Sequence, residues 1–146
     1  MPLSRLIALA ALTAMFAQIG CARQMYHPQR ASEPYPRELH TANSIDVQVF
    51  RDGTTIELVN ATPRSFDNFA LWINQRFVQR VDSLPAGGRL RLSLWDFYDE
   101  RGEIMNAGGF FRAYEPDPVR MVQIQLDDAS PLLGLITIRD EPLEES

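Results

Sequence analysis

The 146-residue sequence has no lysine, a single cysteine and only two histidines, His27 and His40. The lone cysteine, Cys21, has no partner within the chain, so a disulfide framework is excluded. Residues 44–140 contain no cysteine, lysine or histidine at all. Ser-His-Asp, Cys-His and Ser-Lys catalytic groups, and zinc sites built from His and Cys, therefore cannot form within that segment. These absences favour a protein that is not an enzyme.

Clustered positive charge is also missing. All basic residues are arginines, they are scattered along the chain, and the formal net charge is −5 at pH 7. Nucleic-acid binding requires clustered positive charge that neutralises phosphates, so we expect no nucleic-acid partner. There is no long hydrophobic run either. The apolar stretch at residues 6–17 has about 12 residues, whereas a membrane-spanning helix needs about 20.

The first 22 residues have the layout of a secretory signal. Arg5 gives a charged start, residues 6–17 give a short apolar segment, and small residues follow. Ile19-Gly20-Cys21 resembles the lipobox of bacterial lipoproteins, although Gln18 stands where that family usually has leucine. The alternative is ordinary cleavage after Ala22, which would release a soluble exported protein.

The lipoprotein resemblance implies that residues 1–20 are a signal peptide and that Cys21 carries the lipid, a palmitate-type anchor. It also implies a location in the cell envelope, with the protein facing the periplasm. Because Ala22 and not aspartate follows the cysteine, the outer membrane is the expected location. The expected partners are the membrane, through Cys21, and another envelope protein or a glycan.

Residues 21–43 are predicted to form a flexible linker, because prolines and mixed charges occur there without apolar periodicity. At about 3 Å per extended residue, such a spacer would hold a domain some tens of ångströms from a membrane. Residues 44–140 form the predicted domain, and residues 141–146 an acidic tail.

From Ser44 onward, apolar and polar residues alternate with a period of two, which is typical of half-buried strands. Asp52-Gly53 predicts a two-residue hairpin. The expected fold class is all-β, with a single immunoglobulin-like antiparallel β-sandwich of about seven to eight strands. The expected strands lie at residues 45–49, 56–58, 69–73, 76–81, 90–94, 110–114, 119–126 and 133–139.

Four segments between Val59 and Trp95 point to one family. They are Phe69-Ala-Leu-Trp-Ile-Asn74, Phe77-Val78, Leu84-Pro-Ala-Gly-Gly88 and the alternating Leu90, Leu92 and Leu94. Together they resemble CARDB-type domains, which are immunoglobulin-like sandwiches of bacterial extracytoplasmic proteins associated with adhesion. Gln75 stands where such domains often have glycine. The resemblance supports the fold more than a function.

A two-residue hairpin at Asn74-Gln75 would pair Trp72 with Phe77 and place both on one face of the sheet. This pair is a candidate ligand-binding surface, because outward aromatic rings stack on sugars or dock partners. Gln75 is poorly suited to positive φ, so a longer or bulged turn, which would change the register, is one alternative. A loop that covers the pair is the other. In this register the expected core residues are Phe69, Leu71, Ile73 and Val78.

Four acidic residues near one end of the sandwich are a candidate calcium site, since Ca²⁺ takes oxygen ligands from convergent loops. The spacing does not match an EF-hand loop, and a solvated acidic turn is the alternative. Paired carboxylates would also serve a glycoside hydrolase. No other cofactor is expected. The four residues are Asp96, Asp99, Glu100 and Glu103.

These observations predict a non-catalytic interaction or structural module that is tethered to the membrane of the cell envelope. A glycan- or calcium-binding sandwich is the second hypothesis, and a carboxylate-based hydrolase is the third.

Overall fold

The computed structural model describes residues 25–109 and 114–138. The described residues are all-β, as expected, with seven strands and three one-turn 3-10 helices. The 3-10 helices are η1 (Pro28–Arg30), η2 (Arg37–Leu39) and η3 (Leu94–Asp96). The strands are β1 (His40–Asp52), β2 (Thr55–Asn60), β3 (Phe66–Ile73), β4 (Phe77–Leu84), β5 (Arg89–Ser93), β6 (Val122–Gln125) and β7 (Leu132–Ile138).

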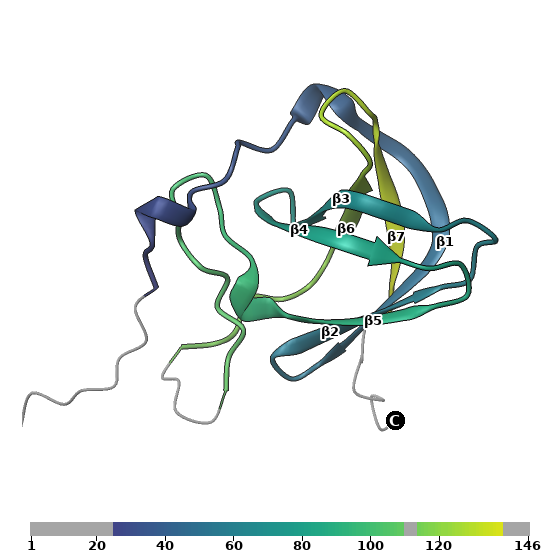
Figure 1. Ribbon diagram of the computed structural model, residues 1–146. Helices are drawn as coiled ribbons and strands as arrows, with labels where there is room; N and C mark the ends of the chain where they lie inside the picture. Colours follow the sequence, from purple (N-terminus) through teal and green to yellow (C-terminus); the bar gives the residue numbers. More distant parts are fainter. Residues whose placement is uncertain (1–24, 110–113, 139–146) are drawn as a thin grey trace, which may run out of the picture.

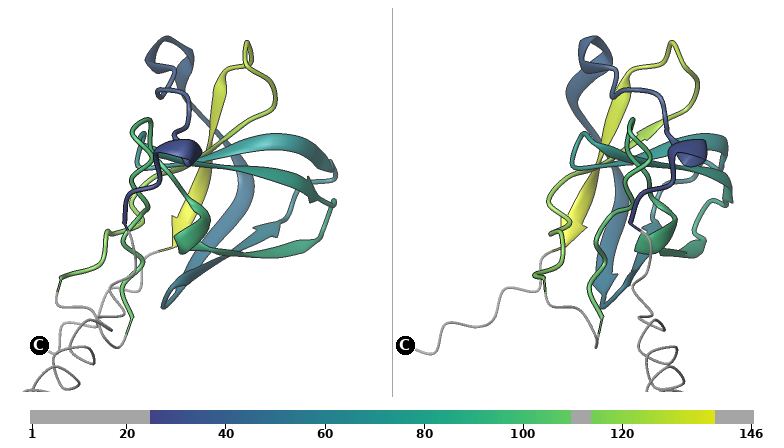
Figure 2. Two further views of the ribbon diagram at one scale, coloured as in Figure 1. Left: turned by 60° about the vertical axis from the view of Figure 1, so that its left-hand side comes forward. Right: turned by 90° about the vertical axis from the view of Figure 1, so that its left-hand side faces the viewer.

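The seven strands form one sheet of order β4-β3-β6-β7-β1-β2-β5. The sheet curls back on itself into a single sandwich that is nearly closed, so that β3 and β4 pass in front of β7 and β1 in the view of Figure 1 (see also Figure 2). After β5 the chain returns to β4, where Val78 and Tyr98 exchange backbone hydrogen bonds of 2.9 and 3.2 Å. Neighbouring strands are antiparallel except β1 and β7, which run parallel.

The predicted two-residue β1–β2 hairpin forms, one position later than the expected Asp52-Gly53 turn. Asp52 pairs with Thr55, so the two loop residues are Gly53 and Thr54, and Gly53 has a φ of +57°. Glycine adopts that conformation without a steric penalty. Strand β1 begins at His40, before the alternating pattern starts at Ser44, because its irregular first half pairs with β7 across a shifted register.

The β3–β4 hairpin has a three-residue loop, so the predicted two-residue turn is wrong. Ile73 pairs with Phe77, which leaves residues 74–76 in the loop, and the first two of these have φ of +53° and +57°. The extra residue shifts β4 by one position, and such a shift moves every side chain to the opposite face. Phe77 therefore enters the core, and Val78, expected in the core, packs on the outer face beside Trp72.

The main core lies inside the curl of the sheet. Phe69, Leu71 and Ile73 are fully buried there, as predicted. A second, smaller cluster on the outer face consists of Ala70, Trp72 and Leu132. The main core also includes residues of β1, β2, β4, β6, β7, the start of β3 and the segment between β5 and β6. These are Val47, Val49, Ile56, Leu58, Phe66, Phe77, Val81, Leu84, Leu94, Phe97, Met105, Ala107, Val119, Val122, Ile124 and Leu135.

Residues 25–39, called the N-terminal strap below, lie against this sandwich. The His27 N–H donates to the Gly102 carbonyl at 2.7 Å, and the Met25 carbonyl accepts from the Ile104 N–H at 2.8 Å. Gly102 has a φ of +80°, and a side chain there would collide with the backbone of His27. Glycine at this position therefore permits the close approach of the strap.

The second half of the strap covers the outer face of β3. The Tyr35 ring packs edge-on against Trp72 with ring centroids 5.3 Å apart, and Leu39 packs on the same cluster. A flexible spacer was expected over residues 21–43. Residues 25–39 instead pack against the sandwich. Their contacts come from backbone hydrogen bonds to distant residues and from single side chains without periodicity, which is why the sequence pattern did not reveal them. Of the strand expected at residues 110–114, residues 110–113 lie outside the described residues.

Candidate functional site

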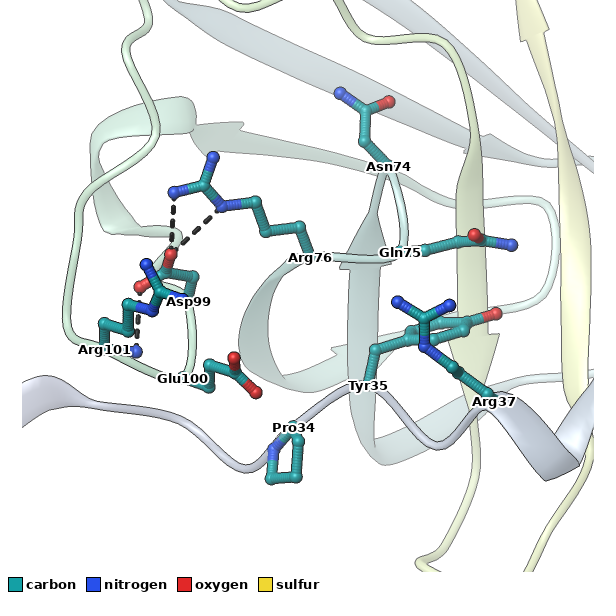
Figure 3. Close-up of a pocket in the computed structure, with 9 residues that line it drawn as sticks. All are labelled: Pro34, Tyr35, Arg37, Asn74, Gln75, Arg76, Asp99, Glu100 and Arg101. Atoms are coloured by element: carbon teal, nitrogen blue, oxygen red, sulfur yellow. Dashed lines mark hydrogen bonds and ion pairs between the residues drawn. The ribbon is translucent and has the colours of Figure 1, made fainter.

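A polar pocket of about 480 Å³ lies where the N-terminal strap meets the β3–β4 loop and the turn that begins at Asp99. Figure 3 shows these three segments surrounding the pocket. Its lining residues are mostly charged or polar, and they are Pro34, Tyr35, Arg37, Asn74, Gln75, Arg76, Asp99, Glu100 and Arg101.

Asp99 holds one wall of the pocket together. Its side chain is only 3% exposed and accepts two hydrogen bonds from Arg76, at 3.0 and 2.8 Å. The backbone N–H groups of Arg101 and Glu103 donate to its other oxygen at 2.9 and 2.8 Å. Burial alone would raise the pKa of Asp99, but these hydrogen bonds and the Arg76 charge outweigh burial and hold the pKa below its usual value. Asp99 is therefore an ionised structural group and a poor general base.

The predicted calcium site is not assembled. Asp99 binds Arg76, and Glu103 makes a second ion pair with the same guanidinium at 2.5 Å, so arginine occupies the place where a cation would sit. Asp96 and Glu100 are exposed. No group of three potential metal ligands occurs within residues 25–109 and 114–138. The alternative, a solvated acidic turn, does not describe this segment either, because Asp99 is buried.

The predicted aromatic surface is not formed either. Trp72 and Phe77 are each only 4% exposed, and they lie on opposite faces because of the one-residue shift in β4. Trp72 is covered by Tyr35, and its indole N–H donates to Gln125 at 3.2 Å. Phe77 belongs to the main core. Two alternatives to an exposed pair were expected, a changed register and a covering segment. Both are present.

Tyr35 connects the pocket to the sheet through a hydrogen-bond network. Its hydroxyl donates to Gln123 at 2.7 Å and lies 2.8 Å from Nδ1 of His40. The Gln123 amide nitrogen lies 3.1 Å from the same ring nitrogen. Burial raises the pKa of Tyr35, although the Gln123 hydrogen bond and the Arg37 charge act in the opposite direction. The phenol is therefore neutral at physiological pH and serves to position the strap.

The β3–β4 loop supplies the rim of the pocket. Asn74 donates to the Pro118 carbonyl at 2.6 Å and accepts from the N–H of Arg120 at 2.9 Å and of Met121 at 3.2 Å. Asparagine tolerates a left-handed conformation, whereas consecutive positive φ at Asn74 and Gln75 is uncommon. Sequence reasoning noticed only the unusual Gln75, since the loop's partners are distant along the chain.

Three charged side chains at the pocket are available to a ligand. Arg37, Glu100 and Arg101 are exposed, and within the described residues no ion pair joins any of them to another side chain. Two guanidinium groups and one carboxylate beside the Tyr35 ring can pair with charged and polar groups of a partner. Because the residues come from separate segments, sequence reasoning found Glu100 alone, and for a different role.

Comparison with protein-family models, curated proteins and solved structures found no match to this chain. Within the described residues, no helix combines the length and the hydrophobicity of a membrane span.

Proposed function

We propose that this chain is an exported bacterial lipoprotein whose β-sandwich is a non-catalytic interaction module of the cell envelope, most consistent with the outer membrane. The observation that carries the proposal is the order of the first residues. A charged start and a short apolar segment precede Ile19-Gly20-Cys21, and this cysteine is the only one in the chain.

The chemistry of the pocket supports binding rather than catalysis. Its most buried carboxylate, Asp99, is ionised and saturated by four hydrogen bonds. Arg76 is engaged by two carboxylates. The groups that remain available, Arg37, Glu100 and Arg101, are suited to recognition because they form directional ion pairs. We therefore assign the pocket to a protein partner in the envelope.

Acyl labelling tests the anchor. The full chain is expressed in a bacterial host with labelled palmitate, beside Cys21→Ser as the matched control. The proposal predicts that the wild-type chain takes up label and sediments with the membranes, and that the Cys21→Ser chain does neither. A wild-type chain that is exported without label would instead support cleavage after Ala22 and a soluble protein.

Capture from the protein's own envelope tests the pocket. The double variant Arg37→Ala/Arg101→Ala is compared with Arg80→Ala, which removes an exposed arginine that contacts the exposed Asp128 and the Asn68 carbonyl, away from the pocket. We expect one envelope protein to be captured by the wild type and by Arg80→Ala, and to be lost with the double variant. Equal capture by all three forms would remove the pocket from the proposal.

A further inference from the structure

The N-terminal strap limits the distance between the domain and Cys21. The Met25 carbonyl and the His27 N–H are hydrogen-bonded to Ile104 and Gly102, so the chain is held from residue 25 onward. Four residue steps separate Cys21 from Met25, and each step spans at most about 3.6 Å. An anchor on Cys21 would therefore lie within about 15 Å of Met25, in place of the tens of ångströms expected from a flexible linker.

The residues around Met25 lie against residues 102–104. Tyr26 pairs with Glu103 in an antiparallel bridge, and a shallow hollow joins Tyr26 to Asn106 and Asp117. Met121 follows Asp117 by four residues along the chain. The strap and the segment after residue 114 lie on the same side of the molecule, opposite the turn between β4 and β5 (Figure 1).

The start of the strap and residues 114–121 carry three of the large hydrophobic side chains that are exposed among the described residues. Tyr114 is 81% exposed, Tyr26 is 51% exposed and Met121 is 39% exposed. Tyrosine is enriched at the headgroup level of bilayers, where its ring meets the apolar boundary and its hydroxyl meets water. The charges nearby are mainly acidic, since Glu103, Glu115 and Asp117 accompany Arg120, so contact with the bilayer would rest on the aromatic and apolar side chains and not on attraction to anionic lipid.

We propose that Tyr26, Tyr114 and Met121 form a membrane-contacting surface that lies against the headgroup region of the bilayer holding lipidated Cys21. This inference rests on the proposed function, because the anchor places the bilayer at this end of the domain. The polar pocket adjoins the same end, since Asn74 and Gln75 line both the pocket and the hollow beside Met121. A partner would then meet the pocket close to the membrane surface.

The test uses the full lipidated chain in vesicles of phosphatidylethanolamine and phosphatidylglycerol that contain spin-labelled lipid. A lipidated Cys21 has no free thiol, so a single introduced cysteine can carry a fluorophore. Arg120→Cys places the label at the proposed surface, and Ala86→Cys is the control in the exposed β4–β5 turn. We expect about twofold stronger quenching at residue 120, because headgroups lie beside that label and far from the other. Replacing both Tyr26 and Met121 by serine should reduce this difference.

The outcomes separate the two proposals. Equal quenching at residues 120 and 86 in protein whose mass includes the lipid would overturn the membrane-contacting surface and leave the lipoprotein proposal intact. A mass without lipid would overturn both. Quenching at residue 120 that is unchanged by the double serine variant would remove Tyr26 and Met121 as contacts.

Discussion

Removal of the Tyr35 side chain is the sharpest perturbation of the N-terminal strap. The Tyr35 ring covers Trp72, and the Tyr35 hydroxyl donates a hydrogen bond to Gln123. Gln123 is only 2% exposed. Tyr35→Ala removes both contacts, whereas Tyr35→Phe keeps the ring and removes only the hydrogen bond. The pair of variants therefore separates packing from hydrogen bonding.

The expected loss of stability follows from these contacts. An edge-on aromatic pair contributes about 0.5–1.5 kcal/mol beyond its buried area. Leaving the buried Gln123 acceptor without its partner costs about 1–3 kcal/mol. We expect Tyr35→Ala to lower the free energy of unfolding by about 1.5–4.5 kcal/mol and Tyr35→Phe by about 1–3 kcal/mol.

Urea denaturation followed by fluorescence measures both effects. In a Trp95→Phe background, Trp72 is the only tryptophan, so its emission reports whether the strap covers it. Tyr35→Ala should shift native-state emission to the red, and Tyr35→Phe should not. A Tyr35→Ala chain within about 0.5 kcal/mol of its parent, with unchanged emission, would refute the docking of the strap.

Three further perturbations test other contacts. Asp99→Asn should destabilise the fold at neutral pH and flatten the acid limb of its stability curve. The native pKa of Asp99 lies below the unfolded value of about 3.9, so the stability that Asp99 contributes is present above that pH and is lost as pH falls through the native pKa. A pH series of urea midpoints measures this loss, and an acid limb that the variant leaves unchanged would contradict it. Gly102→Ala should cost about 1–3 kcal/mol, because it forces a left-handed residue against His27, and hydrogen exchange at the His27 amide should accelerate. Gln75→Gly should raise the melting temperature by relieving a positive φ, with a gain of about 1 kcal/mol by calorimetry, and a lower melting temperature would show that its side chain matters more than its backbone.

The sequence predicted the features that depend on local periodicity and turn chemistry. Alternation placed β1, β2 and β5, and glycine at residue 53 marked the first hairpin. The buried side chains of β3 were also correct, because Phe69, Leu71 and Ile73 face inward. These features are set by neighbours in the chain, which is why a single sequence contains them.

The errors arose where a distant contact decides the local structure. Asn74 is hydrogen-bonded to residues 118–121. The β3–β4 loop that contains Asn74 has three residues, and the resulting register places Phe77 in the core. The strap is held by Tyr35 and Gly102, neither of which belongs to a periodic pattern. The pocket combines three segments, so its arginines had no common signal in the sequence.

The mass of the mature protein, isolated from the membranes of an expressing bacterium, tests the central claim most directly. The account predicts a chain that begins at Cys21 and carries acyl chains on that residue. A mature chain that begins at Arg23, or one that retains Cys21 without a lipid, would contradict it.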